Sequence, residues 1–211
     1  MAKLVDQSYE ILTEIDGMAI LKHIEKIART CYRSEDRITD DGESAKTLVA
    51  ALIKSGHEAM IEHFVISVRF ITDLSFYKDM TRHRMASWAI ESTRYCNYSR
   101  GKFGEELAFI KPVNITEGTK EFDIWYKCML DIERAYLDMA KLGCRPDQMR
   151  MMLPHSVKAE VNLTANLREW RHIFRLRCSS KAHPGISALL RPLLEEFRSK
   201  IPVVFADVTY D

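Results

Sequence analysis

The strongest constraint on the fold is a long run of helical periodicity over residues 118–142. Its large apolar side chains recur every three or four positions, as the core-facing stripe of an amphipathic helix requires. The stripe consists of Phe122, Trp125, Tyr126, Met129, Ile132, Tyr136 and Met139. Gly143 follows directly and ends the pattern. The sequence therefore predicts one long amphipathic helix in the second half of the chain.

Shorter elements are predicted on both sides of this helix. Helical spacing of apolar residues predicts helices over residues 18–32, 43–55, 146–153, 166–177 and 185–200, the last with a kink at Pro192. Alternating or β-branched segments predict strands over residues 63–72, 107–110 and 157–164. Asp73 is expected to cap a helix that follows the first of these strands. Because we find no internal repeat, low-complexity tract or linker, we predict one α+β domain over residues 1–211.

Composition excludes several classes of protein. The 31 basic and 30 acidic residues nearly cancel, so a general attraction to nucleic acid or to anionic membranes is not expected. No apolar run reaches the ~18 residues of a membrane span, and the N-terminus lacks a signal-peptide core, so we predict a cytoplasmic protein. Five scattered cysteines without a Cys-x-x-Cys pair argue against a disulfide framework and against a zinc site, and we predict no metal.

Residues 82–95, with the sequence RHRMASWAIESTRY, gather cations, hydroxyls and a carboxylate beside two aromatic side chains. On a continuous helix residues 82–84 would point about 100° apart, so they would serve different ligands or different parts of one large ligand. On an extended segment Ser92 and Arg94 would share one side, where a hydroxyl and a guanidinium can bind one phosphate. The alternative is a solvated, basic start of a helix followed by a buried Trp88.

The same stretch carries a resemblance to a known family. Arg82-His83-Arg84, seven further residues and Ser92 resemble the signature of the flavin-dependent thymidylate synthases, and residues 93–99 resemble one branch of that family. Further matches follow in the family's order over most of the chain. They are residues 28–34 (ARTCYRS), Gly56-His57-Glu58, Glu62-His63, Arg150 ahead of Leu153-Pro154, and residues 166–177.

The resemblance implies a fold, a reaction and an assembly. The fold would be the family's own α+β domain, a small and mostly antiparallel sheet flanked by long helices, without the dinucleotide fingerprint that this chain also lacks. The reaction would make dTMP from dUMP, with a methylene group from 5,10-methylenetetrahydrofolate and a hydride from FAD, which NADPH re-reduces. The assembly would be a homotetramer with shared active sites. All these ligands are anions, and arginines cluster at 82–94 and 168–177.

Site roles are carried over from the family residue by residue. Arg177 would lie on the uracil ring as the catalytic residue and stabilise the charge that develops when C5 becomes nucleophilic. The predicted dUMP contacts are Asp79, Arg82, Glu91, Ser92, Arg94, Arg150 and Arg177, and Ser92, Arg94 and Arg150 among them would clamp the phosphate. The predicted FAD contacts are His57, Arg82, His83, Arg84, Asn166, Arg168 and His172. Cations beside the isoalloxazine would stabilise the anionic reduced flavin.

Several positions depart from the family's pattern at the predicted site. Ala89-Ile90 replaces a polar pair, Asp79 a longer Gln or Glu, and Ala59 a Ser or Thr. Glu91 could supply the missing carboxylate only if the local backbone shifted by one residue. Two alternatives therefore stay open: a relative of the same fold that captures the methylene intermediate with water to give hydroxymethyl-dUMP, and a nucleotide- or nucleic-acid-binding protein without turnover. The net charge of +1 counts against a nucleic-acid partner.

A cysteine nucleophile is the other chemical alternative. Cys96 lies close to the arginines, which would lower the pKa of its thiol, as in conventional thymidylate synthases. The chain lacks the other hallmarks of those enzymes, and Ser92 is a poor nucleophile without a base held against it. We therefore predict hydride transfer from reduced flavin without an enzymic nucleophile.

Overall fold

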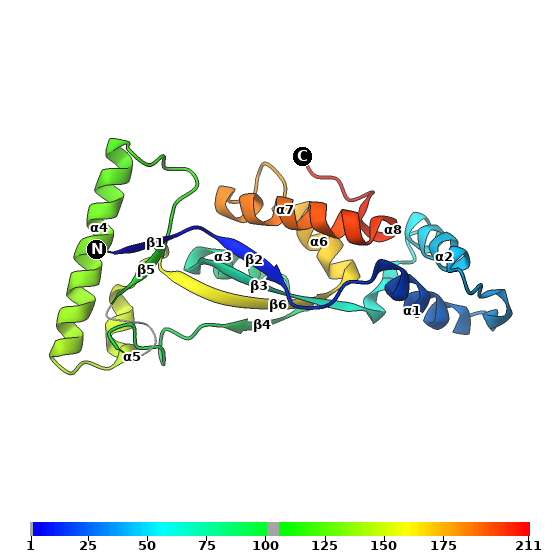
Figure 1. Ribbon diagram of the computed structural model, residues 1–211, viewed down its shortest axis with the longest axis horizontal. Coiled ribbons are helices and arrows are strands. Elements are labelled where there is room, and N and C mark those ends of the chain that lie inside the picture. The colour runs from blue at the N-terminus through cyan, green and yellow to red at the C-terminus, as the bar shows by residue number, and fades with distance from the viewer. Residues whose placement is uncertain (1, 101–105) are drawn as a thin grey trace. The chain divides into compact units, whose positions relative to one another are not determined.

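The computed structural model describes residues 2–100 and 106–211 of the chain (Figure 1). The chain gathers into two compact units. Unit 1 comprises Met1–Tyr9, Arg69–Arg82 and Trp88–Asn162, and unit 2 comprises Glu10–Val68, His83–Ser87 and Leu163–Asp211. The prediction of one domain over residues 1–211 is not tested by this division and stays a prediction.

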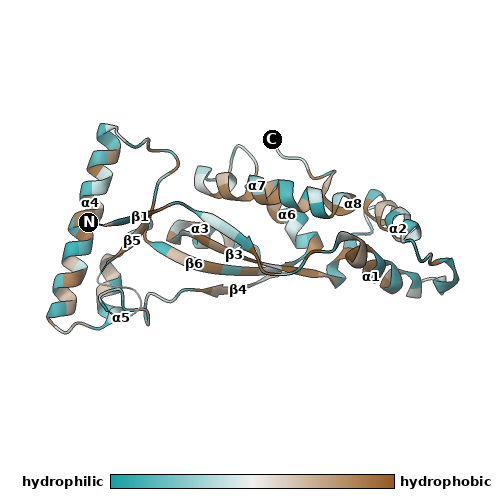
Figure 2. Cartoon of the chain, in the orientation of Figure 1, coloured by the Kyte–Doolittle hydropathy of each residue, from teal (hydrophilic) through white to brown (hydrophobic). Residues whose placement is uncertain are grey.

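A four-stranded antiparallel sheet has the strand order β2 (Ser8–Ile11), β3 (Val65–Asp73), β6 (Lys158–Asn166) and β4 (Ala86–Ile90). Every second residue of the central strands β3 and β6 is buried, and Figure 2 shows the matching alternation of hydropathy along β6. A separate parallel pair joins β1 (Lys3–Val5) to β5 (Ala108–Ile110), with Leu4 opposite Phe109. The predicted α+β class with a small, mostly antiparallel sheet is confirmed.

Unit 1 contains the long predicted helix, α4 (Lys120–Lys141), together with α3 (Leu74–Met80), α5 (Pro146–Met149) and the 3₁₀ helix Arg150–Met152. Asp73 caps α3 as predicted, because its carboxylate accepts the backbone N–H of Phe76 at 3.0 Å. The apolar stripe of α4 packs into a core with Phe109 and Met149 through Met129 and Tyr136. Gly143 follows α4 at a φ of 82°, where a side chain would be strained.

Unit 2 contains α1 (Gly17–Thr30), α2 (Glu43–Lys54), the 3₁₀ helix Glu58–His63, α6 (Leu167–Arg177), α7 (Pro184–Lys200) and α8 (Pro202–Phe205). Its core is aromatic: Trp170, Phe174, Phe197 and Phe205 lie with ring centroids 5.1–6.0 Å apart. The indole N–H of Trp170 donates to the carbonyl of Ile66 at 3.0 Å, so α6 is tied to strand β3 within this unit.

The reading of residues 82–95 as the start of a helix is wrong. Helix α3 ends at Met80, residues 82–84 lie in the connecting segment, and Ala86–Ile90 form the strand β4. Trp88 is only partly buried. Strands β1 and β2 and helix α8 were not predicted either, since each is too short to show a period. Among the described residues, no helix is both long enough and apolar enough to cross a bilayer.

Candidate active site

The predicted site residues fall into both compact units. Unit 1 holds Asp79, Arg82, Glu91, Ser92, Arg94 and Arg150, and unit 2 holds His57, His83, Arg84, Asn166, Arg168, His172 and Arg177. The unit 2 residues come from three segments: helix α6 and its cap, the segment before β4, and the start of the 3₁₀ helix Glu58–His63.

A chain of three side chains connects the two ends of helix α6. The Nε–H of Arg177 donates to Nε2 of His83 at 3.0 Å, and Nδ1 of His83 lies 3.1 Å from Oε1 of Glu169. Because Nε2 accepts a hydrogen bond, the ring proton is assigned to Nδ1, which donates it to the Glu169 carboxylate. His83 is only 4% exposed, whereas Arg177 is half-buried. The structure thus places His83 against the predicted catalytic arginine, and its predicted flavin contact stays a prediction.

The electrostatics of this cluster keep His83 neutral. Burial, reinforced by the charge of Arg177 and by His172, lowers the pKa of His83 to about 4. The ring of His172 meets that of His83 nearly edge-on, with centroids 5.4 Å apart. Burial also raises the pKa of Glu169, against the lowering influence of His172. A neutral imidazole with its proton on Nδ1 is the state that can accept from Arg177 and donate to Glu169 together.

The buried, neutral His83 predicts a loss of stability in acid. A base whose pKa falls on folding binds a proton more tightly in the unfolded state. The folded state therefore keeps its full stability above about pH 6.5 and loses this part of it as the pH falls from 6.5 to about 4. The shift corresponds to at most about 3 kcal/mol. We expect the urea-unfolding free energy of wild type to fall more between pH 7 and 4 than that of His83→Gln. The exposed His155→Gln serves as control, and equal pH slopes for wild type and His83→Gln would refute the assignment.

Three further predicted flavin contacts lie on or beside α6. The side-chain oxygen of Asn166 caps the helix by accepting the backbone N–H of Glu169 at 2.8 Å, so a contact to flavin would use its NH₂ group. The exposed guanidinium of Arg168 donates to Glu62 at 2.6 Å. His172 is exposed on the helix surface. Asn166 thus has a structural function that the family resemblance did not indicate.

Arg171 is a structural residue that the sequence analysis missed. Its side chain is 1% exposed and forms ion pairs with Glu58 at 3.1 Å and Asp207 at 2.6 Å, and it also donates to the carbonyl of Val204. Leu167, Trp170, Arg171 and Phe174 are all buried at helical spacing. That spacing was the available signal, because it places Arg171 on the core-facing side of α6.

A cavity of about 710 Å³ in unit 2 adjoins His57. Two segments that are distant in sequence line it together: residues 28–34 contribute Tyr32, and the segment at Gly56-His57-Glu58 contributes His57, next to the departing position Ala59. His57 and Tyr32 are exposed. A volume of this size is typical of pockets that hold an organic ligand.

Unit 1 holds the predicted phosphate clamp, but its local geometry differs from the prediction. The carbonyl of Ser92 accepts the backbone N–H of Tyr95 at 3.0 Å and that of Cys96 at 2.9 Å. Residues 93–95 therefore form a turn, and the expectation that Ser92 and Arg94 share one side of an extended segment is wrong. Hydrogen bonding within the turn replaces the pairing of β4, which ends at Ile90. Arg94 is exposed and lies over the ring of Tyr95, 5.3 Å from its centroid.

Of the remaining predicted dUMP contacts, Glu91 is the most constrained. Its carboxylate, 9% exposed, accepts from the Tyr98 hydroxyl at 2.7 Å, the Lys158 ammonium at 3.0 Å and the backbone N–H of Glu160 at 3.1 Å. Its own backbone N–H donates to Glu160. Glu91 thus links the end of β4 to β6, and its predicted contact with dUMP stays a prediction. Arg82 and Arg150 are exposed, and Asp79 is partly buried.

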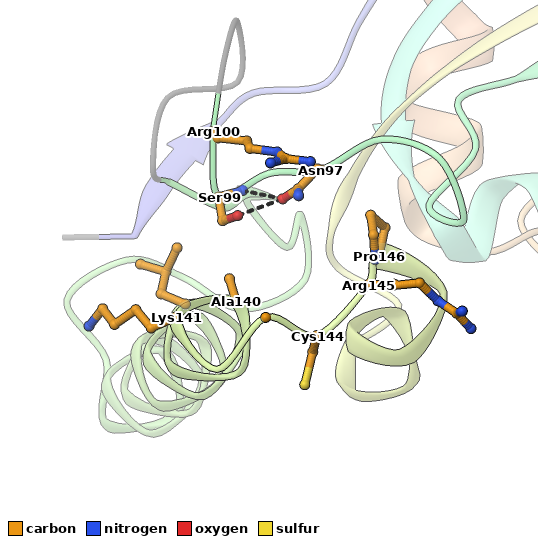
Figure 3. A pocket seen from close by; sticks show the side chains of 10 residues that line it. Asn97, Ser99, Arg100, Ala140, Lys141, Cys144, Arg145 and Pro146 are labelled. Carbon is orange, nitrogen blue, oxygen red and sulfur yellow. Dashed lines mark hydrogen bonds between the residues drawn. The ribbon is translucent and has the colours of Figure 1, made fainter.

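A second cavity, of about 450 Å³, lies in unit 1 between the turn at Asn97–Arg100 and the end of α4 (Figure 3). Its cations are partly neutralised, since Lys141 pairs with Asp138 and Arg145 pairs with Asp147. The Asn97 side chain accepts from both the backbone and the hydroxyl of Ser99, as the dashed lines in Figure 3 mark. None of the predicted site residues lines this cavity.

His83, Glu169 and His172 carry metal-ligating atoms within 4.8 Å of one another, the one such group among the described residues. A metal on Nδ1 of His83 would push the ring proton to Nε2, where it would face the Nε–H of Arg177. Two donors would then oppose each other beside a positive guanidinium. The hydrogen-bond geometry therefore disfavours a metal here, and the absence of a metal site stays a prediction.

Comparisons with known proteins agree on one family. A flavin-dependent thymidylate synthase from Pyrococcus abyssi is 28% identical over 169 residues, which is 79% of this chain and 67% of that protein. The UMP/dUMP methylase PolB from Streptomyces cacaoi has a similar fold, with a TM-score of 0.76, 21% identity and coverage of 97% of this chain and 95% of that one. ThyX from Helicobacter pylori, solved with FAD and dUMP, gives a TM-score of 0.75 at 18% identity over 96% and 98% of the two chains. Since the family profile described as thymidylate synthase complementing protein matches residues 15–203, this chain belongs to that family.

Proposed function

We propose that this protein is an FAD-dependent thymidylate synthase, which methylates dUMP reductively to dTMP. Methylenetetrahydrofolate would donate the carbon and NADPH would serve as reductant. The observation that carries the proposal is the family match over residues 15–203, which includes the arginine signature and the whole of α6. The relatives with that name and the neighbour solved with FAD and dUMP support it.

The predicted dUMP contacts would bind the nucleotide and polarise its uracil ring. Ser92, Arg94 and Arg150 would hold the phosphate through a hydroxyl and two guanidinium groups, which are the groups that pair best with an anion. Arg177 would face the uracil and stabilise negative charge as C5 becomes nucleophilic. Asp79 and Arg82 stay predicted contacts of dUMP. Glu91 also stays a predicted contact of dUMP, and in the structure its carboxylate accepts from Tyr98 and Lys158.

The residues of unit 2 fit a flavin dinucleotide. The cavity at His57 has the size of an organic ligand and an aromatic wall at Tyr32, while the exposed Arg84 and Arg168 suit a pyrophosphate. His172, exposed on α6, and the NH₂ group of Asn166 supply further donors. Bound FAD would supply the hydride that reduces the transferred methylene group. The chain's part is to bind, orient and exclude water around it.

The cysteines give little support to a protein nucleophile. Cys178, next to Arg177, is fully buried, and burial raises the pKa of its thiol to about 12. Cys96, the stronger candidate in the sequence, packs partly buried against the apolar core of unit 1. Catalysis without an enzymic nucleophile is therefore the proposal that suits these residues.

The assembly and location of the protein are further parts of the proposal. We infer a cytoplasmic homotetramer with active sites shared between subunits, with no nucleic-acid or membrane partner. Exposed apolar side chains on α4, such as Ile124, offer surface for contacts between subunits. The near balance of 31 basic and 30 acidic residues is consistent with small anionic ligands rather than nucleic acid.

The test is the mass of the nucleotide formed by purified protein under anaerobic conditions. With dUMP, methylenetetrahydrofolate, FAD and NADPH, we expect the nucleotide to gain one CH₂ group, which identifies dTMP. A gain of a hydroxymethyl group would identify the alternative hydroxymethylase, and unchanged mass with bound nucleotide would identify a binding protein. UMP should be tested in parallel, because the structural neighbour PolB is described as acting on both UMP and dUMP.

A further inference from the structure

We propose that Glu169 is a positioning residue for the reaction, which acts through the imidazole of His83 to fix the orientation of Arg177. This inference rests on the proposed function for the role of Arg177 and on the geometry of unit 2 for the linkage itself. Neither the family signature nor the comparisons give Glu169 a role.

The linkage spans the length of one helix. Glu169 lies in the first turn of α6 and Arg177 is its last residue, about 12 Å further along the axis. Both are long side chains, and helical side chains lean toward the N-terminus, so the Arg177 guanidinium can reach back toward Glu169. The ring of His83, which comes from the segment before β4, fills the space between them and contacts each with one nitrogen.

The direction of each hydrogen bond depends on Glu169. An ionised carboxylate can only accept, so it selects the tautomer of His83 that carries its proton on Nδ1. That leaves the lone pair of Nε2 to accept the Nε–H of Arg177. Holding Nε fixes the plane of the guanidinium and aims its two terminal NH₂ groups. With the other tautomer, two N–H groups would face each other, and Arg177 would have to move.

The surroundings of His83 favour this arrangement. Among the described residues, the charged or titratable groups that contact the ring are Glu169, His172 and Arg177, all from α6. Arg177 and His172 both lower the pKa of the His83 ring, and the Glu169 carboxylate is the acceptor that lies within hydrogen-bond distance of Nδ1. The side chains of His83 and Glu169 are 3% and 11% exposed, so water cannot readily replace the carboxylate.

A matched pair of variants tests the linkage through kinetics. Glu169→Gln keeps an acceptor for Nδ1–H, and we expect kcat for dUMP within about fivefold of wild type. Glu169→Leu keeps similar volume but removes the acceptor, and we expect kcat to fall about 10- to 100-fold with a smaller change in the KM for dUMP. In a His83→Gln background, where an amide oxygen can accept from Arg177, Glu169→Leu should cost little more.

A second measurement separates this inference from the proposed function. In ¹⁵N-histidine NMR spectra of the full-length protein without substrates, His83 should carry its proton on Nδ1 in wild type and Glu169→Gln, and on Nε2 or both nitrogens in Glu169→Leu. The proposal fails if all three proteins show the same tautomer, or if Glu169→Gln and Glu169→Leu lose equal activity. If wild type makes no dTMP but the tautomers differ as expected, the proposed function fails and the linkage stands.

Discussion

Replacement of Arg177 by alanine is expected to lower kcat for dTMP formation by about 10²- to 10³-fold, while dUMP still binds. The reason is that Nε–H of Arg177 donates to Nε2 of His83, so the guanidinium is oriented before the substrate arrives. A preoriented cation stabilises the charge that develops on the uracil ring more than it stabilises the uncharged ring of bound dUMP. The measurement is the initial rate of dTMP formation together with the dissociation constant of dUMP from calorimetry.

Arg175→Ala is the matched control for this prediction. Arg175 lies two residues earlier on the same helix and is 41% exposed, and its ion pairs within the described part of the chain are both 3.9 Å long. The Arg175→Ala variant removes the same charge from α6, and its kcat should stay within about twofold of wild type. If Arg177→Ala turned over as fast as Arg175→Ala, the assignment of Arg177 as the catalytic residue would be wrong. If both variants lost activity equally, the net charge of the helix would matter rather than one oriented group.

Local patterns predicted the long elements of the fold and missed the short ones. The segments 118–142 and 157–164 correspond to α4 and β6, because each carries a clear period over many residues. Strand β4 has only five residues and lies in the basic stretch after α3, where charge suggested a solvated helix. Its place in the sheet comes from pairing with β6, and the hydrogen bonds just beyond its end join Glu91 to Glu160, 69 residues later. No local pattern contains a pairing of that kind.

The sequence likewise predicted only part of the candidate site. The signature at 82–92 and the motif at 166–177 named the residue types, and the structure gathers His83 and Arg177 in unit 2. The part played by Glu169 could not be predicted, since its partner His83 lies 86 residues away and a glutamate in the first turn of a helix is common. The turn at Ser92 was likewise missed, because an alternating pattern of polar residues does not distinguish an extended segment from a turn.

The largest loss of stability is expected from Arg171→Met. Arg171 joins three segments of unit 2: it binds Glu58 of a 3₁₀ helix, Asp207 near the C-terminus, and the carbonyl of Val204 in α8. Removing one partner of a buried ion pair leaves the others unpaired and typically costs 3–5 kcal/mol. Glu58 and Asp207 keep side-chain exposures of 17% and 53%, so we expect the lower end, about 3 kcal/mol. The thermal midpoint should fall by about 6–12 °C.

Arg175→Met controls for the loss of charge, because Arg175 faces the same two carboxylates at 3.9 Å from an exposed position. Its midpoint should change by about 2 °C or less. The difference between the variants should also depend on pH. Arg171 lowers the pKa of Asp207, so the pair contributes stability above the usual pKa range of an aspartate and loses it as pH falls through the lowered value. The penalty of Arg171→Met should therefore shrink in strong acid. A penalty that stayed unchanged there would mean that Arg171 stabilises unit 2 through its packing and its bond to Val204 rather than through its charge.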